Sequence, residues 1–293
     1  MEQEKSKVAF MSVLAALFLT SFKFIIGILT GSIGILSEAL HSGLDLVAAI
    51  VTLFAVKISN KPSDSDHHYG HGKIENFSAL IETLLLFATC FWIIKEVAER
   101  LISGKGLALN TTQTIFAFVV IITSIIIDYW RSRKLSKIAK KYKSQALEAD
   151  ALHFSTDILS SFVVLIGLIC VKIYEWTNLS FFFYADSIAA LFVSIIIIYI
   201  CWSLGKASID ALLDKAPEKE SRDIKNIIEN FPTVLKYHDL KIRNSGHILF
   251  VEATIHVDST LSLIDAHNIT DDIENKIIEY DKYAIVAIHV EPN

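Results

Sequence analysis

EALHSGLD at residues 38–45 and DALHFSTD at residues 150–157 are two near copies of one pattern: an acidic residue, Ala-Leu-His, three varied residues and Asp. Both copies lie in apolar stretches long enough to cross a bilayer, which needs about 20 residues. A His and an Asp four residues apart share one face of a helix. Ionisable side chains are costly inside a membrane and indicate a transport path. The repeat therefore predicts membrane helices that carry a polar site.

The composition argues against a soluble protein and a nucleic-acid partner. Of 293 residues, 53% are hydrophobic and the mean hydropathy is +0.47, whereas an average soluble chain is about 45–50% apolar. The net charge of −5 offers no basic surface for nucleic acid. The three cysteines lie in apolar segments without a CxxC pair, so we interpret them as buried small side chains. The first apolar run is too long for a signal peptide and predicts a membrane helix.

Six apolar stretches are long enough to span the bilayer. They cover approximately residues 8–30, 33–57, 77–100, 112–131, 146–174 and 181–205. The first two are joined only by Thr30-Gly31-Ser32, which predicts a tight helical hairpin.

Basic residues predict the orientation. The link between the fourth and fifth stretches contains Arg131, Arg133, Lys134, Lys137, Lys140, Lys141 and Lys143. The link between the second and third contains Lys57, Lys61 and Lys73. Both links are predicted to be cytoplasmic by the positive-inside rule. With an even number of spans, both termini of this multi-pass protein are expected on the cytoplasmic side of the cell (inner) membrane.

The last third predicts a small α+β domain. A helix is expected from Pro217, strands over residues 235–243 and 248–257, a helix over residues 261–279 and a strand over residues 283–290. The order is αββαβ, which suggests two layers. We divide the chain into a membrane domain over residues 1–207 and a cytoplasmic domain over residues 208–293.

Alternation in the strands predicts which side chains leave the core of this domain. Val251, Ala253, Ile255 and Val257 form one apolar face of the second strand, and the last strand alternates likewise. Residues of alternate parity point to the other face of the sheet. His256, His289 and Glu291 are therefore expected on that other face, with His238 on the first strand alternating less cleanly.

Two opposed copies of the repeat would supply two imidazoles and two carboxylates. The set is His41, Asp45, His153 and Asp157. Four such ligands suit tetrahedral Zn²⁺, and the two carboxylates offset its charge in a low dielectric. Protons compete with metal for imidazole, so the same residues can carry protons back. Glu38 and Asp150 are interpreted either as hydrogen-bond partners of the histidines or as helix-end charges. For the His and Asp residues of the repeat, the weaker alternative is that they are polar contacts that pack helices together.

The other eight histidines fall into two groups. Asp64, His67 and His71 lie in the link after the second span and form a candidate loop site if the link is locally helical. His238, His256, His289 and Glu291, with His267 on the intervening helix, form a candidate site in the cytoplasmic domain. We interpret His68 and His247 as solvated bystanders.

These motifs together resemble the cation diffusion facilitator family of zinc-type transporters, most closely its bacterial ferrous-iron and zinc efflux members. The resemblance covers essentially the whole chain. It rests on the paired His-x-x-x-Asp, on Asp64-x-x-His67-x-Tyr69-Gly70-His71-Gly72-Lys73 and on the late histidines. It implies a homodimer with six membrane helices per protomer, a ferredoxin-like regulatory domain, and exchange of metal for H⁺ by alternating access.

The resemblance also implies roles for individual residues. The repeat would be the transport site, His238, His256, His289 and Glu291 would hold two metals in the cytoplasmic domain, and His267 would bridge them. Lys73 and Asp214 would form a charge interlock. His153 favours zinc over manganese, whereas Fe²⁺, Co²⁺ and Cd²⁺ suit the same ligands.

Two other functions remain open from the sequence. An intramembrane zinc enzyme would keep an open coordination position for water, whereas four ligands close the sphere and no HExxH motif occurs. A non-transporting metal sensor would bind metal in the cytoplasmic domain without flux. The favoured hypothesis is a transporter, not an enzyme.

Overall fold

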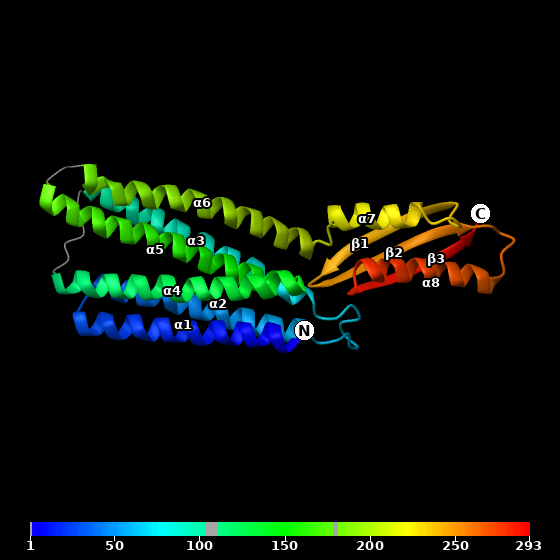
Figure 1. The fold of residues 1–293 in the computed structure, drawn as a ribbon, viewed down its shortest axis with the longest axis horizontal. Coiled ribbons are helices and arrows are strands. Elements are labelled where there is room, and N and C mark those ends of the chain that lie inside the picture. Colours follow the sequence, from blue (N-terminus) through cyan, green and yellow to red (C-terminus); the bar gives the residue numbers. More distant parts are fainter. Residues whose placement is uncertain (1, 104–110, 178–180) are drawn as a thin grey trace.

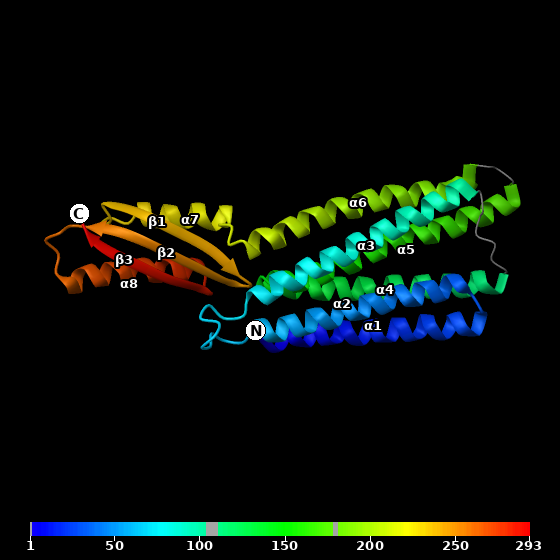
Figure 2. The same ribbon diagram turned by 180° about the vertical axis from the view of Figure 1, so that it is seen from behind.

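The computed structural model describes residues 2–103, 111–177 and 181–293. A helical bundle and a small α+β domain lie end to end along the long axis, and the N-terminus lies at the end of the bundle next to the α+β domain (Figures 1 and 2). The bundle helices are α1 (Glu2–Thr30), α2 (Ile33–Ser59), α3 (Lys73–Ser103), α4 (Thr111–Tyr142), α5 (Gln145–Thr177) and α6 (Phe181–Leu212).

The six predicted membrane helices are confirmed. The shortest has 27 residues and the longest 33. At 1.5 Å per residue these are about 40–50 Å long, which exceeds the ~30 Å hydrocarbon core of a bilayer. The helices therefore extend beyond the membrane, and their outward faces carry large exposed apolar side chains such as Phe18 and Ile126.

The basic link between the fourth and fifth spans is helical, contrary to the prediction of a loop. Helix α4 continues to Tyr142 and α5 begins at Gln145, so only Lys143 and Ser144 connect them. Lys143 turns the chain with a positive φ of 50°. Lysine and arginine are good helix formers, and Lys140 and Lys141 in the last turn suit the helix dipole. The predicted hairpin between α1 and α2 is confirmed, with Ser32 capping α2.

The C-terminal domain has the predicted order αββαβ. It comprises α7 (Glu218–Glu229), β1 (Lys236–Ser245), β2 (Ile248–Val257), α8 (Leu263–Tyr280) and β3 (Ala284–Pro292). The sheet order is β1-β2-β3, with β1 antiparallel and β3 parallel to β2. Both helices cover one face, because Ile228 of α7 and Ile273 of α8 share a core with Val251 and Ile255 of β2. The predicted apolar face of β2 is therefore confirmed. The opposite face carries no helix among the described residues, although Tyr69 of the loop after α2 packs edge-on against the buried Phe250 there.

The bundle and the C-terminal domain meet at the β1–β2 turn. A Cβ atom at Gly72 would lie 2.3 Å from the Ser245 carbonyl oxygen, so only glycine permits this approach. The Gly246 backbone N–H donates to Asn76 Oδ1 at 3.2 Å. His247 is buried at this junction and packs edge-on against Tyr283, so the prediction that it is surface in a turn was wrong.

Candidate metal centres

The two copies of the repeat face each other inside the bundle. His153 of α5 lies with its Nε2 3.2 Å from Asp45 Oδ1 of α2 and 3.6 Å from Asp157 Oδ2. His41 Nε2 lies 4.0 Å from the same Asp45 oxygen. The structure thus brings all four predicted ligands to one place, although Asp45 and His153 are 108 residues apart in sequence.

Helix geometry accounts for this arrangement. Each His and Asp pair is separated by one helical turn and occupies one helix face, as the spacing predicts. Asp45 and His153 are buried, whereas His41 is partly exposed. The His153 carbonyl accepts a hydrogen bond from Thr156 Oγ1 at 2.7 Å. Three of the four residues, Asp45, His153 and Asp157, have ligand atoms within 4.8 Å of one another. The set offers two nitrogens and two carboxylates to a cation.

The acidic residues that precede each His do not support the imidazoles. Glu38 is paired with Lys23 at 3.2 Å and its side chain is half exposed. Asp150 is buried and accepts from Ser12 Oγ at 3.2 Å. His153 Nδ1 has no hydrogen-bond partner among the described residues. Asp150 lies about one helical turn before His153, and its carboxylate points to Ser12 of α1 rather than to the His153 ring.

Several buried charges lie near the repeat; Lys23, Asp128 and Glu82 were not predicted, and Arg131 was assigned to the basic link. Lys23 Nζ donates to Ser42 Oγ at 2.8 Å. Arg131 pairs with Asp128 at 3.1 Å and stacks 3.4 Å from the Phe154 ring centre. Glu82 is fully buried and accepts from Thr52. Each is an ionisable residue within or beside an apolar stretch, so the argument that singled out the repeat could have found them.

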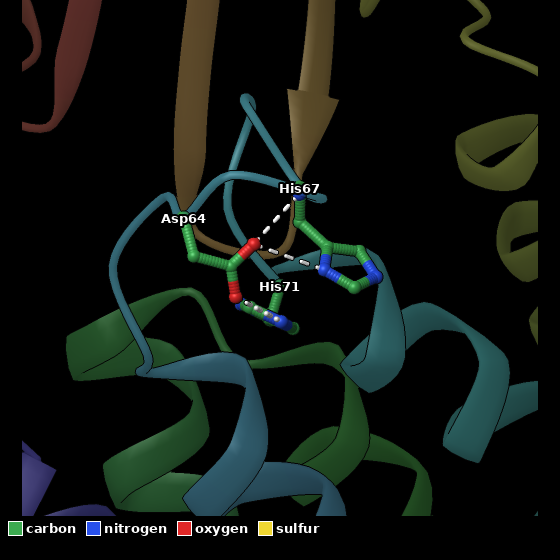
Figure 3. A group of neighbouring side chains, drawn as sticks. All are labelled: Asp64, His67 and His71. Atoms are coloured by element: carbon green, nitrogen blue, oxygen red, sulfur yellow. Dashed lines mark hydrogen bonds and ion pairs between the residues drawn. The ribbon is translucent and has the colours of Figure 1, made fainter.

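The loop group assembles around Asp64 (Figure 3). Asp64 Oδ1 accepts from the His67 backbone N–H at 2.7 Å and lies 3.2 Å from His67 Nδ1, while Oδ2 lies 3.5 Å from His71 Nε2. The segment is a turn rather than the helix on which the prediction depended. The hydrogen bond from the His67 backbone, with smaller contributions from Asp66 and the His67 ring, lowers the pKa of Asp64 below its usual 3.8.

The cytoplasmic group is centred on Glu291, which lies on β3. One carboxylate oxygen, Oε2, lies 3.6 Å from His238 Nε2 of β1 and 3.7 Å from His256 Nε2 of β2. The other, Oε1, lies 3.6 Å from His289 Nε2. The register pairs His256 with Glu291 across β2 and β3. These four residues lie on the sheet face opposite the helices, where alternation predicted His256, His289 and Glu291.

His267 is not brought to this group within one chain. It lies on α8, which covers the other face of the sheet, and its side chain is exposed. Its ion pair within the described residues is with Asp271 at 3.7 Å. The bridging role that the resemblance implies for His267 therefore has no counterpart in the geometry of a single chain.

Comparison with known proteins gives matches along the whole chain. The model of the cation efflux transmembrane domain matches residues 9–213, and that of the cation efflux protein cytoplasmic domain matches residues 216–293. The cation-efflux pump FieF of Yersinia enterocolitica is 29% identical over all of this chain and 95% of its own length. An uncharacterized transporter of Methanocaldococcus jannaschii is 31% identical over 99% of both chains. Among solved structures, the metal-bound C-terminal domain of the CzcD transporter from Thermotoga maritima is 36% identical over 25% of this chain and 87% of that one, with a TM-score of 0.25.

Proposed function

Because the chain belongs to the cation efflux family, we propose that it exports divalent metal ions, zinc above all, from the cytoplasm in exchange for protons. The observation that carries the proposal is the contact of His153 with Asp45 across α2 and α5. It supports one cation site shared between two helices. We propose His41, Asp45, His153 and Asp157 as its ligands.

The spacing of these atoms supports a small tetrahedral cation. Four ligands at Zn²⁺ bond lengths of about 2.0–2.1 Å lie roughly 3.3–3.4 Å from one another. The His153 nitrogen lies 3.2 and 3.6 Å from its two carboxylate oxygens, which is close to that separation. The His41 nitrogen, at 4.0 Å from Asp45, needs only a small side-chain movement to complete the set. Fe²⁺, Co²⁺ and Cd²⁺ are the alternative cargoes.

Burial of the site supports coupling to protons. Asp45 and Asp157 bring two negative charges into a bundle interior where an uncompensated charge is costly. A departing cation leaves that charge to be neutralised, and protons on the carboxylates and imidazoles can neutralise it. In an antiport cycle the same site opens in turn to each side of the membrane. It binds metal when open to one side and protons when open to the other.

The cytoplasmic group supports a regulatory role. His238, His256, His289 and Glu291 lie on the sheet face that no described helix covers. Their partly exposed side chains leave room there for a second copy of the chain. Metal shared across that face would hold two protomers together in a homodimer, with His267 of one copy free to serve the other. The Asp64 loop contacts the same domain, since its Gly72 end packs on Ser245, and is a candidate entry site.

The arrangement of the basic residues supports cytoplasmic termini in an inner membrane. The basic end of α4, the N-terminus and the C-terminal domain all lie at the same end of the bundle (Figure 1). The positive-inside rule assigns that end to the cytoplasm.

Flux into proteoliposomes tests the proposal. The purified chain should move Zn²⁺ when a pH gradient is imposed, and Asp157→Asn should abolish that movement. Glu99→Gln is the matched control, because Glu99 is an exposed carboxylate on the membrane helix α3. Zn²⁺ movement that ignores the pH gradient would contradict antiport. Metal binding on the sheet without any flux would favour a membrane-bound metal sensor, and a metal-bound water with hydrolytic activity would favour an enzyme.

A further inference from the structure

A groove with a volume of about 530 Å³ lies between the cytoplasmic ends of α1 and α4. Its apolar lining includes Val8, Met11, Trp130 and Leu135. The volume falls in the range of small-molecule sites, which is about 300–1,000 Å³. The groove shares no residue with the three candidate metal centres.

Three positive charges at this groove have no compensating carboxylate. Lys7 of α1 and Lys134 and Lys137 of α4 line it and are exposed. None of the three has an ion pair among the described residues, whereas Lys141 is paired with Glu4 at 2.7 Å and Arg131 with Asp128 at 3.1 Å. The groove therefore carries surplus positive charge that favours an anionic occupant.

Apolar stripes continue from the groove toward the centre of the bilayer. On α1, Met11 is followed by the exposed Leu14 and Phe18 on the same helix face. On α4, Trp130 is preceded by the exposed Ile126 and Ile122 at one-turn spacing. Basic residues at the interface above outward-facing apolar side chains match the two ends of a phospholipid.

We propose that this groove binds an anionic phospholipid of the cytoplasmic leaflet. Lys7, Lys134 and Lys137 hold the headgroup phosphate, and the acyl chains lie along the stripes of α1 and α4. A soluble anion would satisfy the lysines but not the apolar stripes. The helical form of residues 131–142 is essential to the site, because positions 130, 134, 137 and 141 share a face only in a helix.

Trp130 provides the measurement. With Trp92, Trp176 and Trp202 replaced by Phe, the remaining tryptophan lies in the groove. Bilayers of phosphatidylcholine containing a small fraction of brominated phosphatidylglycerol should quench Trp130 more strongly than the same fraction of brominated phosphatidylcholine. The relative affinity should favour the anionic lipid on the order of tenfold or more, as expected for three lysines at a membrane surface.

Charge variants decide whether the groove is responsible. The preference for the anionic lipid should be abolished in a triple variant that carries Lys7→Gln, Lys134→Gln and Lys137→Gln. The triple variant with Arg at the same three positions should keep the preference. That result would also show that the site tolerates substitution. The control Lys57→Gln with Arg133→Gln and Lys140→Gln removes three charges from the same side of the membrane but outside the groove. Equal loss in the control would overturn the proposal in favour of general surface attraction, as would equal quenching by both lipids in the unaltered groove. Displacement of the brominated lipid by millimolar inorganic phosphate would assign the groove to soluble anions instead.

Discussion

The intramembrane group and the cytoplasmic sheet group use the same ligand types in opposite surroundings. In the bundle, the side chains of His153, Asp45 and Asp157 are 4%, 12% and 17% exposed. On the sheet, those of His238, His256 and Glu291 are 40%, 16% and 41% exposed, and that of His289 is 71% exposed. Donor–acceptor distances are similar in the two groups, so solvent rather than spacing distinguishes them.

This difference suggests how the same ligands serve two tasks. A buried pair of carboxylates must be neutralised at all times, by metal or by protons, because its desolvation is costly. A group on an open sheet face can stay empty, because water solvates its charges. The first arrangement favours obligatory exchange of one cation for another, and the second favours a response to metal concentration.

The largest expected effect is at His153, whose ring contacts both carboxylates of the buried group. His153→Ala removes the central ligand and leaves Asp45 and Asp157 without the imidazole that contacts both. Loss of an outer-sphere partner of a metal costs about 10–100-fold, so loss of this ligand should lower initial Zn²⁺ flux by more than about 100-fold. His68→Ala is the matched control, since His68 is exposed and, among the described residues, its ring bonds only to the Ser65 carbonyl. If the His153 variant kept its Zn²⁺ flux, the buried group would not be the transport site, and the assignment of different tasks to the two groups would be wrong.

A smaller effect is expected at His256, which links β2 to Glu291 of β3. His256→Ala should shift the Zn²⁺ concentration for half-maximal flux upward by about tenfold while the maximal flux stays within about twofold, because the cargo ligands are unchanged. The measurement is flux against free Zn²⁺ with the full chain. A fall in maximal flux to the level of the His153 variant would show that the sheet group is part of the cargo path.

The sequence predicted the four candidate ligands in the membrane helices, but it did not predict the elements around them as well. His41, Asp45, His153 and Asp157 could be found because apolar length and four-residue spacing fix the helix face locally. The helical extension of α4 was missed because a basic run was interpreted as a link. Burial of His247 was missed because it arises only when the β1–β2 turn docks on Gly72, a contact between distant segments. The turn at Asp64 depends on a hydrogen bond from the His67 backbone N–H to the Asp64 carboxylate, which hydrophobic periodicity does not reveal.

A pH effect is expected where the two domains meet. Burial, aided by Lys5, lowers the pKa of His247 below its usual 6.5 against the opposing effect of Glu75 and Asp281. Because the docked state disfavours the charged ring, docking is fully stable above about pH 6.5 and weakens as the pH falls below that value. The protection factor of the β1–β2 turn, which is the exchange rate corrected for the intrinsic pH dependence of amide exchange, should therefore fall between pH 7.5 and 5.5. His247→Gln should remove this pH dependence, whereas His267→Gln, at an exposed position on α8, should keep it.

The smallest effect is expected at Asp214, which accepts from Lys73 at 3.0 Å and from Arg243 at 3.2 Å. Burial alone would raise the pKa of Asp214, but these two cations lower it below 3.8. Its contribution is therefore complete above about pH 4 and lost only in acid, so it adds no pH dependence between pH 5 and 8. The pair is partly exposed, so Asp214→Asn should cost no more than about 1 kcal/mol, and less in high salt. Thermal unfolding at low and high ionic strength measures this, with Asp210→Asn, which removes the exposed Lys215 pair, as the control. If Asp214→Asn instead abolished the shift in Zn²⁺ dependence seen with His256→Ala, the interlock would transmit the state of the sheet group to the buried group.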